Sequence, residues 1–186
     1  WLPGLADGST IMVPAWLEPQ GGYGEKGVQL RAETSSATAV VSGTKRHVRF
    51  AAGADSFLVL ARTDQGVDFF VVPSDLTGIT LEQRFSIASD SQYDVSFDAV
   101  EVPLTNRVGS AGSGWSTWSE VMCQAIVLIA AQATGGAQKT LEITVEYAKD
   151  RYQFDKPLGA FQSLSHYMDD AKTRIDGARI LVLEAA

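Results

Sequence analysis

The chain has 186 residues, of which 45% are apolar and 20% charged, values typical of a folded globular protein with one domain or two small ones. Twenty-two acidic and fifteen basic residues give a net charge of −7, and no run of Lys and Arg is present to neutralise several phosphates, which argues against nucleic acid as a partner. The single cysteine, Cys123, excludes an internal disulfide and a zinc site built from several cysteines.

The first part of the chain is rich in turn residues, since 13 of the 17 glycines and five of the six prolines lie at or before Gly114. Short runs of β-branched and aromatic residues alternate with these turns. The runs are Thr10–Val13, Val28–Ala32, Ala37–Val41, Phe57–Arg62, Val67–Val72 and Tyr93–Val102. This spacing predicts an antiparallel β-barrel or β-sandwich domain over residues 1–113. Within it, the turn residues Asp64 and Gly66 predict a hairpin over Phe57–Val72.

Residues 114–186 have a helical pattern, because they contain a single proline and their apolar positions recur every three or four residues. The pattern predicts one long helix over about residues 116–152 and a second with an apolar stripe along one face. The stripe consists of Phe161, Leu164, Met168, Ala171, Ile175, Ala178 and Val182. Two helices cannot bury both of their apolar faces, so we expect further helices of a longer protein, or another copy of the chain, to cover them.

No membrane span is predicted, because the longest strongly apolar stretch, Ala125–Ala131, is far shorter than the roughly 20 residues that a bilayer requires. The chain opens with Trp1-Leu2-Pro3-Gly4 and shows neither an initiator Met nor a secretory signal. We therefore expect a piece of a longer cytoplasmic protein.

Most catalytic motifs are missing from the sequence. There is no HExxH, CxxC or GxSxG, and the two histidines, His47 and His166, lie in different halves of the chain. No metal site is predicted, because the sequence offers too few candidate metal ligands. The glycine clusters at residues 21–24 and 112–114 do not match a dinucleotide-binding motif and are interpreted as turns.

The segment Tyr147–Pro157 brings Arg, Gln and Phe together at the end of the first predicted helix. The guanidinium of Arg151 can offer a planar pair of donors to a phosphate, and Phe154 can cover an aromatic ring system. Gln153 and Gln162 would add neutral donors and acceptors. The alternatives are an i, i+4 ion pair between Arg151 and Asp155, or a plain solvated face, and spacing alone leaves these interpretations open.

Several motifs, in the right order along the whole chain, resemble those of the flavin-dependent acyl-CoA dehydrogenases. Tyr147-Ala148, Arg151, Gln153-Phe154, Pro157 and Phe161-Gln162 resemble the pattern at that family's second helical domain. Glu18-Pro19 is similar to the family's Thr-Glu-Pro turn, and residues 43–49 resemble its Gly-x-Lys-x-Trp-Ile-Thr strand. Residues 54–61 and 95–103 resemble the next strand and the segment that closes the β-domain. Gly109, Gly114-Trp115 and Gly135 fall where the family enters and packs its first C-terminal helix.

The resemblance implies an α+β fold: a middle β-domain over residues 1–113, and over residues 114–186 the first two helices of an incomplete C-terminal four-helix bundle. In that family FAD lies between the β-domain of one subunit and the helical domain of its neighbour, with the substrate thioester against the flavin ring. The residues that the resemblance assigns to FAD are Trp16, Leu17, His47 and Arg49 beside the ring, and Arg151, Gln153, Phe154 and Gln162 around the pyrophosphate of the neighbour's FAD.

Four positions depart from the family pattern. Leu17 replaces a Thr that bonds the flavin, His47 replaces a Trp that covers the ring, and Arg49 replaces a Thr or Ser near the reactive nitrogen. A leucine side chain has no donor, so at least one flavin hydrogen bond, worth about 1 kcal/mol, is lost or rerouted through the backbone. Asp155 replaces the glycine after Phe154 and puts a carboxylate near the expected pyrophosphate, which is electrostatically unfavourable unless Arg151 and Lys156 compensate.

The family's reaction needs a carboxylate that takes the α-proton of the thioester while a hydride leaves the β-carbon for the flavin. In most members that base lies beyond the region this chain covers, and at the alternative position, early in the first long helix, this chain has Ala125. No catalytic residue is therefore predicted within the chain.

The resemblance implies an FAD-dependent acyl-CoA dehydrogenase subunit present as a fragment, which by itself would be inactive. Its expected partners are an acyl-CoA, an electron-transfer acceptor protein and other subunits, in a homo- or hetero-oligomer that forms a dimer or tetramer through the helical domain. The alternatives are a non-catalytic structural subunit of a heteromeric acyl-CoA dehydrogenase, and a flavin-dependent oxidase or monooxygenase on the same scaffold.

Overall fold

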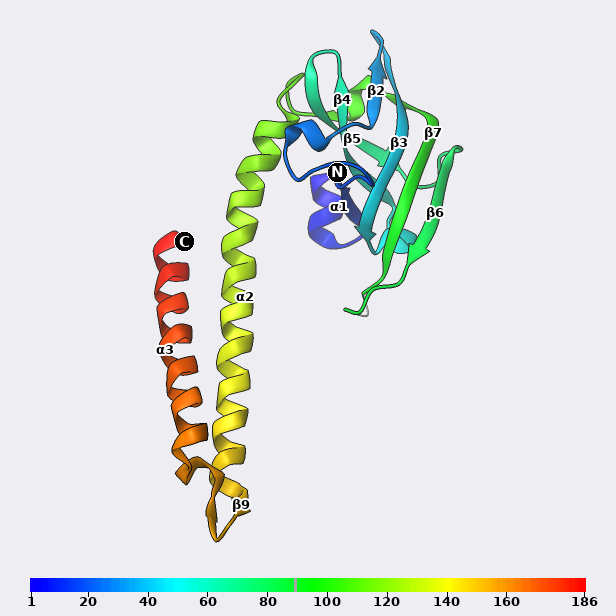
Figure 1. Cartoon of the computed structure of the whole chain (residues 1–186). Coiled ribbons are helices and arrows are strands. Elements are labelled where there is room, and N and C mark those ends of the chain that lie inside the picture. Colours follow the sequence, from blue (N-terminus) through cyan, green and yellow to red (C-terminus); the bar gives the residue numbers. More distant parts are fainter. Residues whose placement is uncertain (89) are drawn as a thin grey trace. The chain divides into compact units, whose positions relative to one another are not determined.

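The computed structural model describes residues 1–88 and 90–186, which divide into two compact units, Trp1–Trp118 and Ser119–Ala186 (Figure 1). The first unit holds a sheet and the second a pair of long helices, so the predicted α+β class is confirmed. The elements of the first unit are α1 (Leu2–Asp7), β1 (Met12–Ala15), β2 (Arg31–Thr34), β3 (Thr38–Arg49), β4 (Ser56–Thr63), β5 (Gly66–Pro73), β6 (Ile79–Arg84), β7 (Gln92–Pro103) and β8 (Arg107–Val108). They are followed by α2 (Gly114–Asp150), β9 (Tyr152–Gln153), β10 (Lys156–Pro157) and α3 (Gln162–Ala185).

One sheet of eight strands forms the first unit, in the order β6-β7-β3-β2-β4-β5-β8, with β1 added alongside β4. The predicted hairpin is confirmed: β4 and β5 pair antiparallel, and Thr63 and Gly66 face each other across a turn of two residues. The expectation of a wholly antiparallel sheet was wrong in two places, because β1 and β2 both pair with β4 in parallel. Parallel partners are joined by long connections, which leave no local turn signal in the sequence.

A hydrophobic core packs against this sheet. Its members come from strands β1 to β5 and β7, and from the loops between them. Two of its phenylalanines, Phe57 and Phe97, meet edge to face with ring centroids 6.0 Å apart. Strand β3 supplies Ala39, Val41 and Val48 to this core, and exposed residues such as Ser42, His47 and Arg49 lie between or beside the buried ones.

Strand β3 is irregular where it carries the candidate site residues. Its pairing with β7 shifts register between Val41 and Gly43 and again between Lys45 and Val48. Gly43 has a φ of 137°, which glycine adopts at little cost, whereas His47, in the second irregularity, has a φ of 56°. A histidine in the left-handed region is uncommon and directs its side chain differently from that of a regular strand residue.

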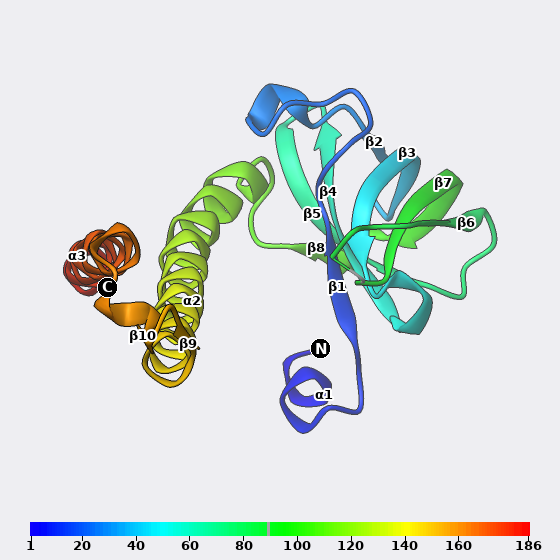
Figure 2. The same ribbon diagram turned by 60° about the horizontal axis from the view of Figure 1, so that its bottom comes forward.

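The helices of the second unit, α2 and α3, lie side by side in both ribbon views (Figures 1 and 2). The predicted stripe is confirmed at six of its seven positions, which are partly buried along α3 and at its N-cap. Leu164 is the exception: it is 41% exposed, and Ser165 takes the partly buried place in the first turn of the helix. On α2, Leu141 and Ala148 are buried.

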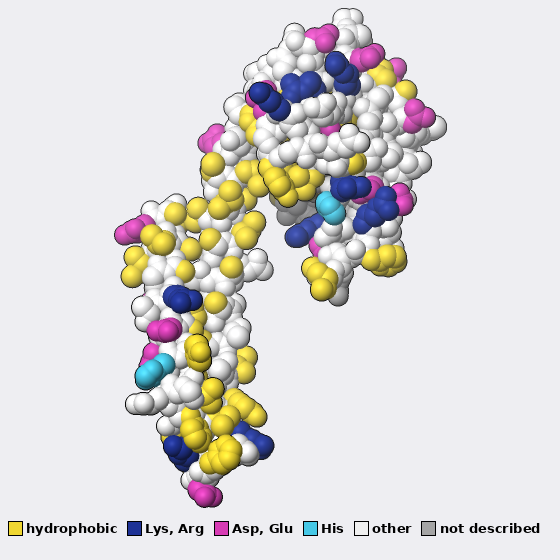
Figure 3. Space-filling model, in the orientation of Figure 1, with side chains coloured by type: hydrophobic (Ala, Val, Ile, Leu, Met, Phe, Trp, Pro, Cys, Tyr) yellow, Lys and Arg dark blue, Asp and Glu magenta, His cyan; other side chains and the backbone are white. Residues whose placement is uncertain are grey.

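Apolar side chains are also exposed along both helices (Figure 3). Among them Leu128 is 71% exposed and Leu181 67%. By length and composition alone, α2 is apolar enough to cross a membrane. None of the residues in its most apolar stretch is buried within this chain. A helix of this kind needs a cover, whether other helices or another subunit.

Candidate functional site

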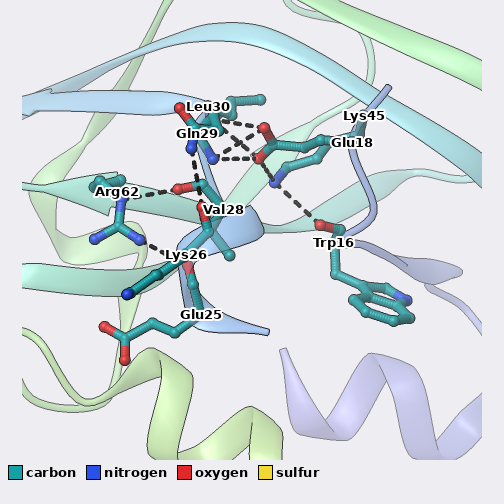
Figure 4. A network of polar contacts seen from close by, with 9 residues as sticks. All are labelled: Trp16, Glu18, Glu25, Lys26, Val28, Gln29, Leu30, Lys45 and Arg62. Atoms are coloured by element: carbon teal, nitrogen blue, oxygen red, sulfur yellow. Dashed lines mark hydrogen bonds and ion pairs between the residues drawn. The ribbon is translucent and has the colours of Figure 1, made fainter. Parts of the chain in front are cut away.

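An ion pair buried in the first unit fixes the loop that follows β1 (Figure 4). Lys45 of β3 has no exposed surface, and its Nζ lies 2.6 Å from Glu18 Oε1 and 3.3 Å from the carbonyl oxygen of Trp16. The Glu18 carboxylate also accepts the backbone N–H groups of Gln29 and Leu30 at 2.9–3.1 Å. Burial lowers the pKa of the Lys45 ammonium, and the hydrogen bond and charge of Glu18 oppose that shift.

A second polar anchor holds the far end of the same loop. The guanidinium of Arg62 donates to the carbonyl oxygens of Val28 and Glu25 at 2.8 and 2.7 Å (Figure 4). Together the two anchors tie residues 16–30 to strands β3 and β4. The backbone of Trp16 and Leu17 is therefore held in place, which a binding surface needs.

The side chain of Trp16 lies in an aromatic cluster within the first unit. Its ring centroid is 5.2 Å from that of Trp118 and 6.2 Å from that of Tyr23, and Trp118 in turn contacts Phe69 at 5.9 Å. The Trp16 carbonyl accepts from Lys45, so both ends of this residue are engaged. Its assignment to the flavin ring stays a prediction.

Leu17 and His47 are brought close by a backbone hydrogen bond, in which the N–H of Arg46 donates to the carbonyl oxygen of Leu17 at 2.8 Å. The half-buried Leu17 side chain adds no polar group to this surface. His47 and Arg49 are both exposed, and they lie near each other on β3. The structure thus groups three of the four predicted flavin-ring residues at the site where β3 passes the end of β1.

A chain of polar contacts links His47 to Arg49. The Nδ1 atom of His47 lies 2.8 Å from Gln92 Oε1, and the Gln92 amide Nε2 donates to both oxygens of Asp90 at 2.9 Å. Arg49 Nε lies 3.1 Å from the same Asp90 carboxylate. The hydrogen bond from Gln92 is the main cause that lowers the pKa of Asp90, and the charge of Arg49 acts in the same direction.

In the second unit, the segment between the helices forms a small hairpin. Strands β9 and β10 pair antiparallel, and Phe154 and Asp155 form the turn with φ values of 54° and 62°. Such a turn favours Asn-Gly or Asp-Gly, so neither residue is a preferred one. Phe154 is 86% exposed, yet its ring meets that of Phe161 edge to face at 6.3 Å, and Lys156 Nζ lies 4.2 Å from the centre of the Phe161 ring.

Arg151 stands at the base of this hairpin and is exposed. Its carbonyl oxygen accepts the N–H of Leu158 at 2.8 Å, which fixes its backbone. Within the described residues its guanidinium forms no ion pair, and in particular none with Asp155, so the ion-pair interpretation is not what the structure shows. An exposed arginine agrees both with a solvated face and with a phosphate-binding role. Gln153 and Gln162 are exposed in the same segment.

These groups suit a pyrophosphate. An unpaired guanidinium and two neutral amides supply donors for phosphate oxygens, and the exposed face of Phe154 offers a contact for a flat ring. The Asp155 carboxylate is the one unfavourable charge. On the β-domain the donor set is sparser, because Arg49 is paired with Asp90 and Leu17 has no polar atom, which leaves His47 and backbone groups to meet the polar edge of a flavin.

Ala125 lies partly buried on α2 and has no group that accepts a proton. No cluster of metal-ligating side chains occurs among residues 1–88 and 90–186.

Sequence reasoning named His47 and Arg49 but missed Gln92 and Asp90, which lie some 45 positions away and belong to no motif. A cross-strand contact of this range leaves no signal in a single sequence.

Comparisons with known proteins agree with this fold and these motifs. The middle domain of acyl-CoA dehydrogenases matches residues 15–100, and the C-terminal domain of acyl-CoA dehydrogenases matches residues 112–186. A sheet domain and a helix pair that carry both domain signatures define an acyl-CoA dehydrogenase architecture. The chain belongs to the acyl-CoA dehydrogenase family.

Three relatives illustrate the similarity. The short-chain specific acyl-CoA dehydrogenase of Megasphaera elsdenii is 31% identical over 191 residues, which cover 98% of this chain and 50% of that protein. The caffeyl-CoA reductase-Etf complex subunit CarC of Acetobacterium woodii is 26% identical over 100% of this chain and 51% of its own length. The glutaryl-CoA dehydrogenase of Mycobacterium smegmatis, solved in complex with FADH2, is 28% identical with a TM-score of 0.90, over 99% of this chain and 48% of that one.

The chain spans about half the length of the curated relatives it matches. The match to the C-terminal domain includes the whole of α2. The apolar faces of that helix are therefore those of a domain-forming helix in this family.

Proposed function

We propose that the chain forms the middle and part of the C-terminal region of an FAD-dependent acyl-CoA dehydrogenase subunit, which removes hydrogen from the α and β carbons of an acyl-CoA thioester. Family membership supports the reaction class, and the relative solved with FADH2 supports the cofactor. We place the protein in the cytoplasm and in a homo- or hetero-oligomer, a dimer or tetramer, that forms through the helical domain.

Arg151 carries the proposal. Its guanidinium is exposed and unpaired within the described residues, at the base of a hairpin whose backbone is fixed. We assign it, with Gln153, Phe154 and Gln162, to the pyrophosphate region of an FAD bound by the neighbouring subunit. A guanidinium at this place neutralises phosphate charge with two parallel hydrogen bonds.

The β-domain would border the flavin of its own subunit through Trp16, Leu17, His47 and Arg49. The Glu18–Lys45 pair holds the backbone of Trp16 and Leu17, so these residues meet a ligand without first being ordered. Bulky neighbours such as Trp16 and Trp118 would also keep water away from the ring.

FAD supplies the hydride acceptor of this reaction when it is bound. This chain's own residues bind and orient, and none of them takes the α-proton, because the alternative base position holds Ala125. We expect the carboxylate in the remainder of the full-length protein. The CarC relative, named as part of an Etf complex, supports an electron-transfer protein as the acceptor of the electrons.

The test is Arg151→Ala in the full-length protein. A charge-assisted bidentate contact is worth about 1.5–3 kcal/mol, so FAD binding should weaken by roughly 10- to 100-fold, measured by titrating the apoprotein with FAD and following flavin fluorescence. Arg31→Ala, an exposed arginine of β2, is the matched control and should leave FAD binding unchanged. Equal affinities of Arg151→Ala and the wild type would contradict the assignment.

A second candidate is a non-catalytic subunit of a heteromeric acyl-CoA dehydrogenase. The sparse donor set of the β-domain favours it, since Leu17 offers no donor and Arg49 is paired with Asp90. The two candidates differ in one measurement: the full-length protein purified alone, loaded with FAD under anaerobic conditions, is bleached by its acyl-CoA if it is catalytic. A structural subunit stays yellow with every acyl-CoA until its partner is added.

A further inference from the structure

The contacts around His47 determine which of its nitrogens carries the proton. A carboxylate only accepts hydrogen bonds, so the Gln92 group that faces both Asp90 oxygens at 2.9 Å is the NH₂ end of the amide. The other end, Oε1, therefore faces His47 Nδ1 at 2.8 Å. A carbonyl oxygen cannot donate, so His47 Nδ1 is the donor. In the neutral ring the lone pair is then left on Nε2, for which no partner is present among the described residues.

The backbone conformation of His47 and its neighbours fix the position of this ring. His47 has a φ of 56° at a register shift of β3, a conformation that costs a non-glycine residue free energy and that persists only when its surroundings impose it. Gln92 sits opposite Arg49 across the β3–β7 ladder, and Arg49 pairs with the same Asp90 that orients the Gln92 amide. One carboxylate thus fixes both exposed side chains of this surface. Its pKa is lowered by these same contacts, which keeps it ionised.

We propose that Gln92 and Asp90 are positioning residues that hold the His47 imidazole with Nδ1 protonated, so that Nε2 accepts a hydrogen bond from an N–H or O–H group of the bound ligand. The ligand half of this proposal rests on the proposed function, whereas the positioning half concerns the chain alone. With His47 in this state, the surface favours a ligand group that donates a hydrogen bond. The tryptophan expected at this position would offer only its own N–H and a flat apolar face. That donor comes either from the flavin or from the acyl-CoA.

The positioning half is tested by long-range ¹H–¹⁵N correlation spectra of the full-length protein labelled with ¹⁵N-histidine, at about pH 8, where an ordinary imidazole is neutral. The His47 signals are assigned by their loss in His47→Asn. We expect the Nδ1–H tautomer in the wild type and a mixture of tautomers in Gln92→Met. Gln92→Glu should retain the Nδ1–H tautomer, because its carboxylate still accepts from Nδ1.

Gln83→Met is the matched control, since Gln83 lies on the neighbouring strand β6, outside this chain of contacts, and it should leave the His47 signals unchanged. A wild type with the proton on Nε2, or a Gln92→Met spectrum identical to that of the wild type, would overturn the positioning role. A variant that merely loosened the fold would broaden all histidine signals rather than change one tautomer.

The ligand half is tested by adding first FAD and then a non-oxidisable acyl-CoA analogue. A shift of the Nε2 signal toward its protonated value with FAD alone identifies the flavin as the donor, and a shift only with the analogue identifies an N–H or O–H group of the acyl-CoA as the donor. No shift at either step overturns the ligand half. The visible spectrum shows separately whether FAD has bound, so a failure of the proposed function is distinguished from a failure of the His47 contact.

Discussion

Lys45 is a charged side chain with no exposed surface, and among the described residues its counter-charge is Glu18 at 2.6 Å. Taking an ammonium out of water costs several kcal/mol, and only a close, hydrogen-bonded partner offsets this cost. The same pair fixes the Trp16 carbonyl, so one contact contributes to both stability and site geometry. The sequence motifs included both residues but gave no indication that they pair, because they lie on different elements 27 positions apart.

Breaking the Glu18–Lys45 ion pair should strongly destabilise the fold. Glu18→Ala leaves Lys45 buried without a counter-charge, and we expect the free energy of unfolding to fall by about 3–5 kcal/mol, measured by urea denaturation of the full-length protein. The double variant Glu18→Leu/Lys45→Met removes both charges and should be less destabilised than Glu18→Ala alone. Additive losses in the two single variants and the double variant would contradict a direct coupling.

The pH dependence of stability gives an independent test. Burial lowers the pKa of Lys45 in the folded chain, so between that pKa and about 10.4 the unfolded chain binds more protons, and the free energy of unfolding rises with pH. Glu18→Gln removes the charge that opposes the shift and so extends this window downward. The variant should therefore regain part of its lost stability relative to the wild type as the pH rises through the alkaline range toward about 10. A loss that is the same across this range would contradict the argument.

At the scale of elements, the hairpin β9–β10 lies in the proposed pyrophosphate site, although the residues of its turn are unfavourable for that turn. Phe154 and Asp155 both adopt positive φ, where a glycine at the second position would be unstrained. The turn also carries the Asp155 carboxylate a few residues from Arg151. A sequence that keeps such a turn accepts both a backbone and an electrostatic cost.

Asp155→Gly should therefore improve two quantities. The free energy of unfolding should rise by about 0.5–1 kcal/mol, because glycine adopts the left-handed conformation without a side-chain clash. FAD affinity of the full-length protein should also increase, since a negative charge leaves the neighbourhood of the pyrophosphate. Asp155→Asn separates the two effects, because it removes the charge and keeps a side chain; it should raise FAD affinity while changing stability less. Unchanged affinity in both variants would place the pyrophosphate elsewhere.

Element prediction from the sequence succeeded where a pattern is long. The 3, 4 spacing of the α3 stripe extends over six turns and marked the buried face at all positions except Leu164. Strand β6 was missed because its residues, from Ile79 to Arg84, are mostly exposed and polar, and it is ordered by pairing with β7 instead of by a buried face. Short edge strands of this kind depend on their neighbour.

At the scale of the whole molecule, the helices expose more apolar surface than a monomer keeps in water. Leu128, Ile129 and Leu181 are each more than 60% exposed within this chain. Clusters of this kind mark surfaces that other helices or subunits cover. The family match assigns residues 112–186 to a C-terminal domain, and the chain covers about half of the length of its relatives.

The 186-residue chain by itself should therefore self-associate. Sedimentation velocity should show oligomers whose population grows with concentration, and Leu128→Glu should shift the distribution toward monomer because a carboxylate cannot be buried in such a contact. Ser116→Glu, a polar and exposed position in the first turn of α2, is the control and should not change the distribution. A wild-type chain that stays monomeric at high concentration would contradict the expectation.

The pairing of β3 with β7 also affects how the chain is made. Val41 and Val100 face each other in the sheet although they lie about 60 residues apart, so at about 5–20 residues per second β3 leaves the ribosome several seconds before its partner. During that interval β3 has one of its two hydrogen-bonded neighbours in the sheet, β2. The helix pair needs no such delay, because helices form from neighbouring residues within microseconds. The β3–β7 pairing during synthesis thus awaits residue 103, and until then the edge of β3 that β7 covers is open to aggregation.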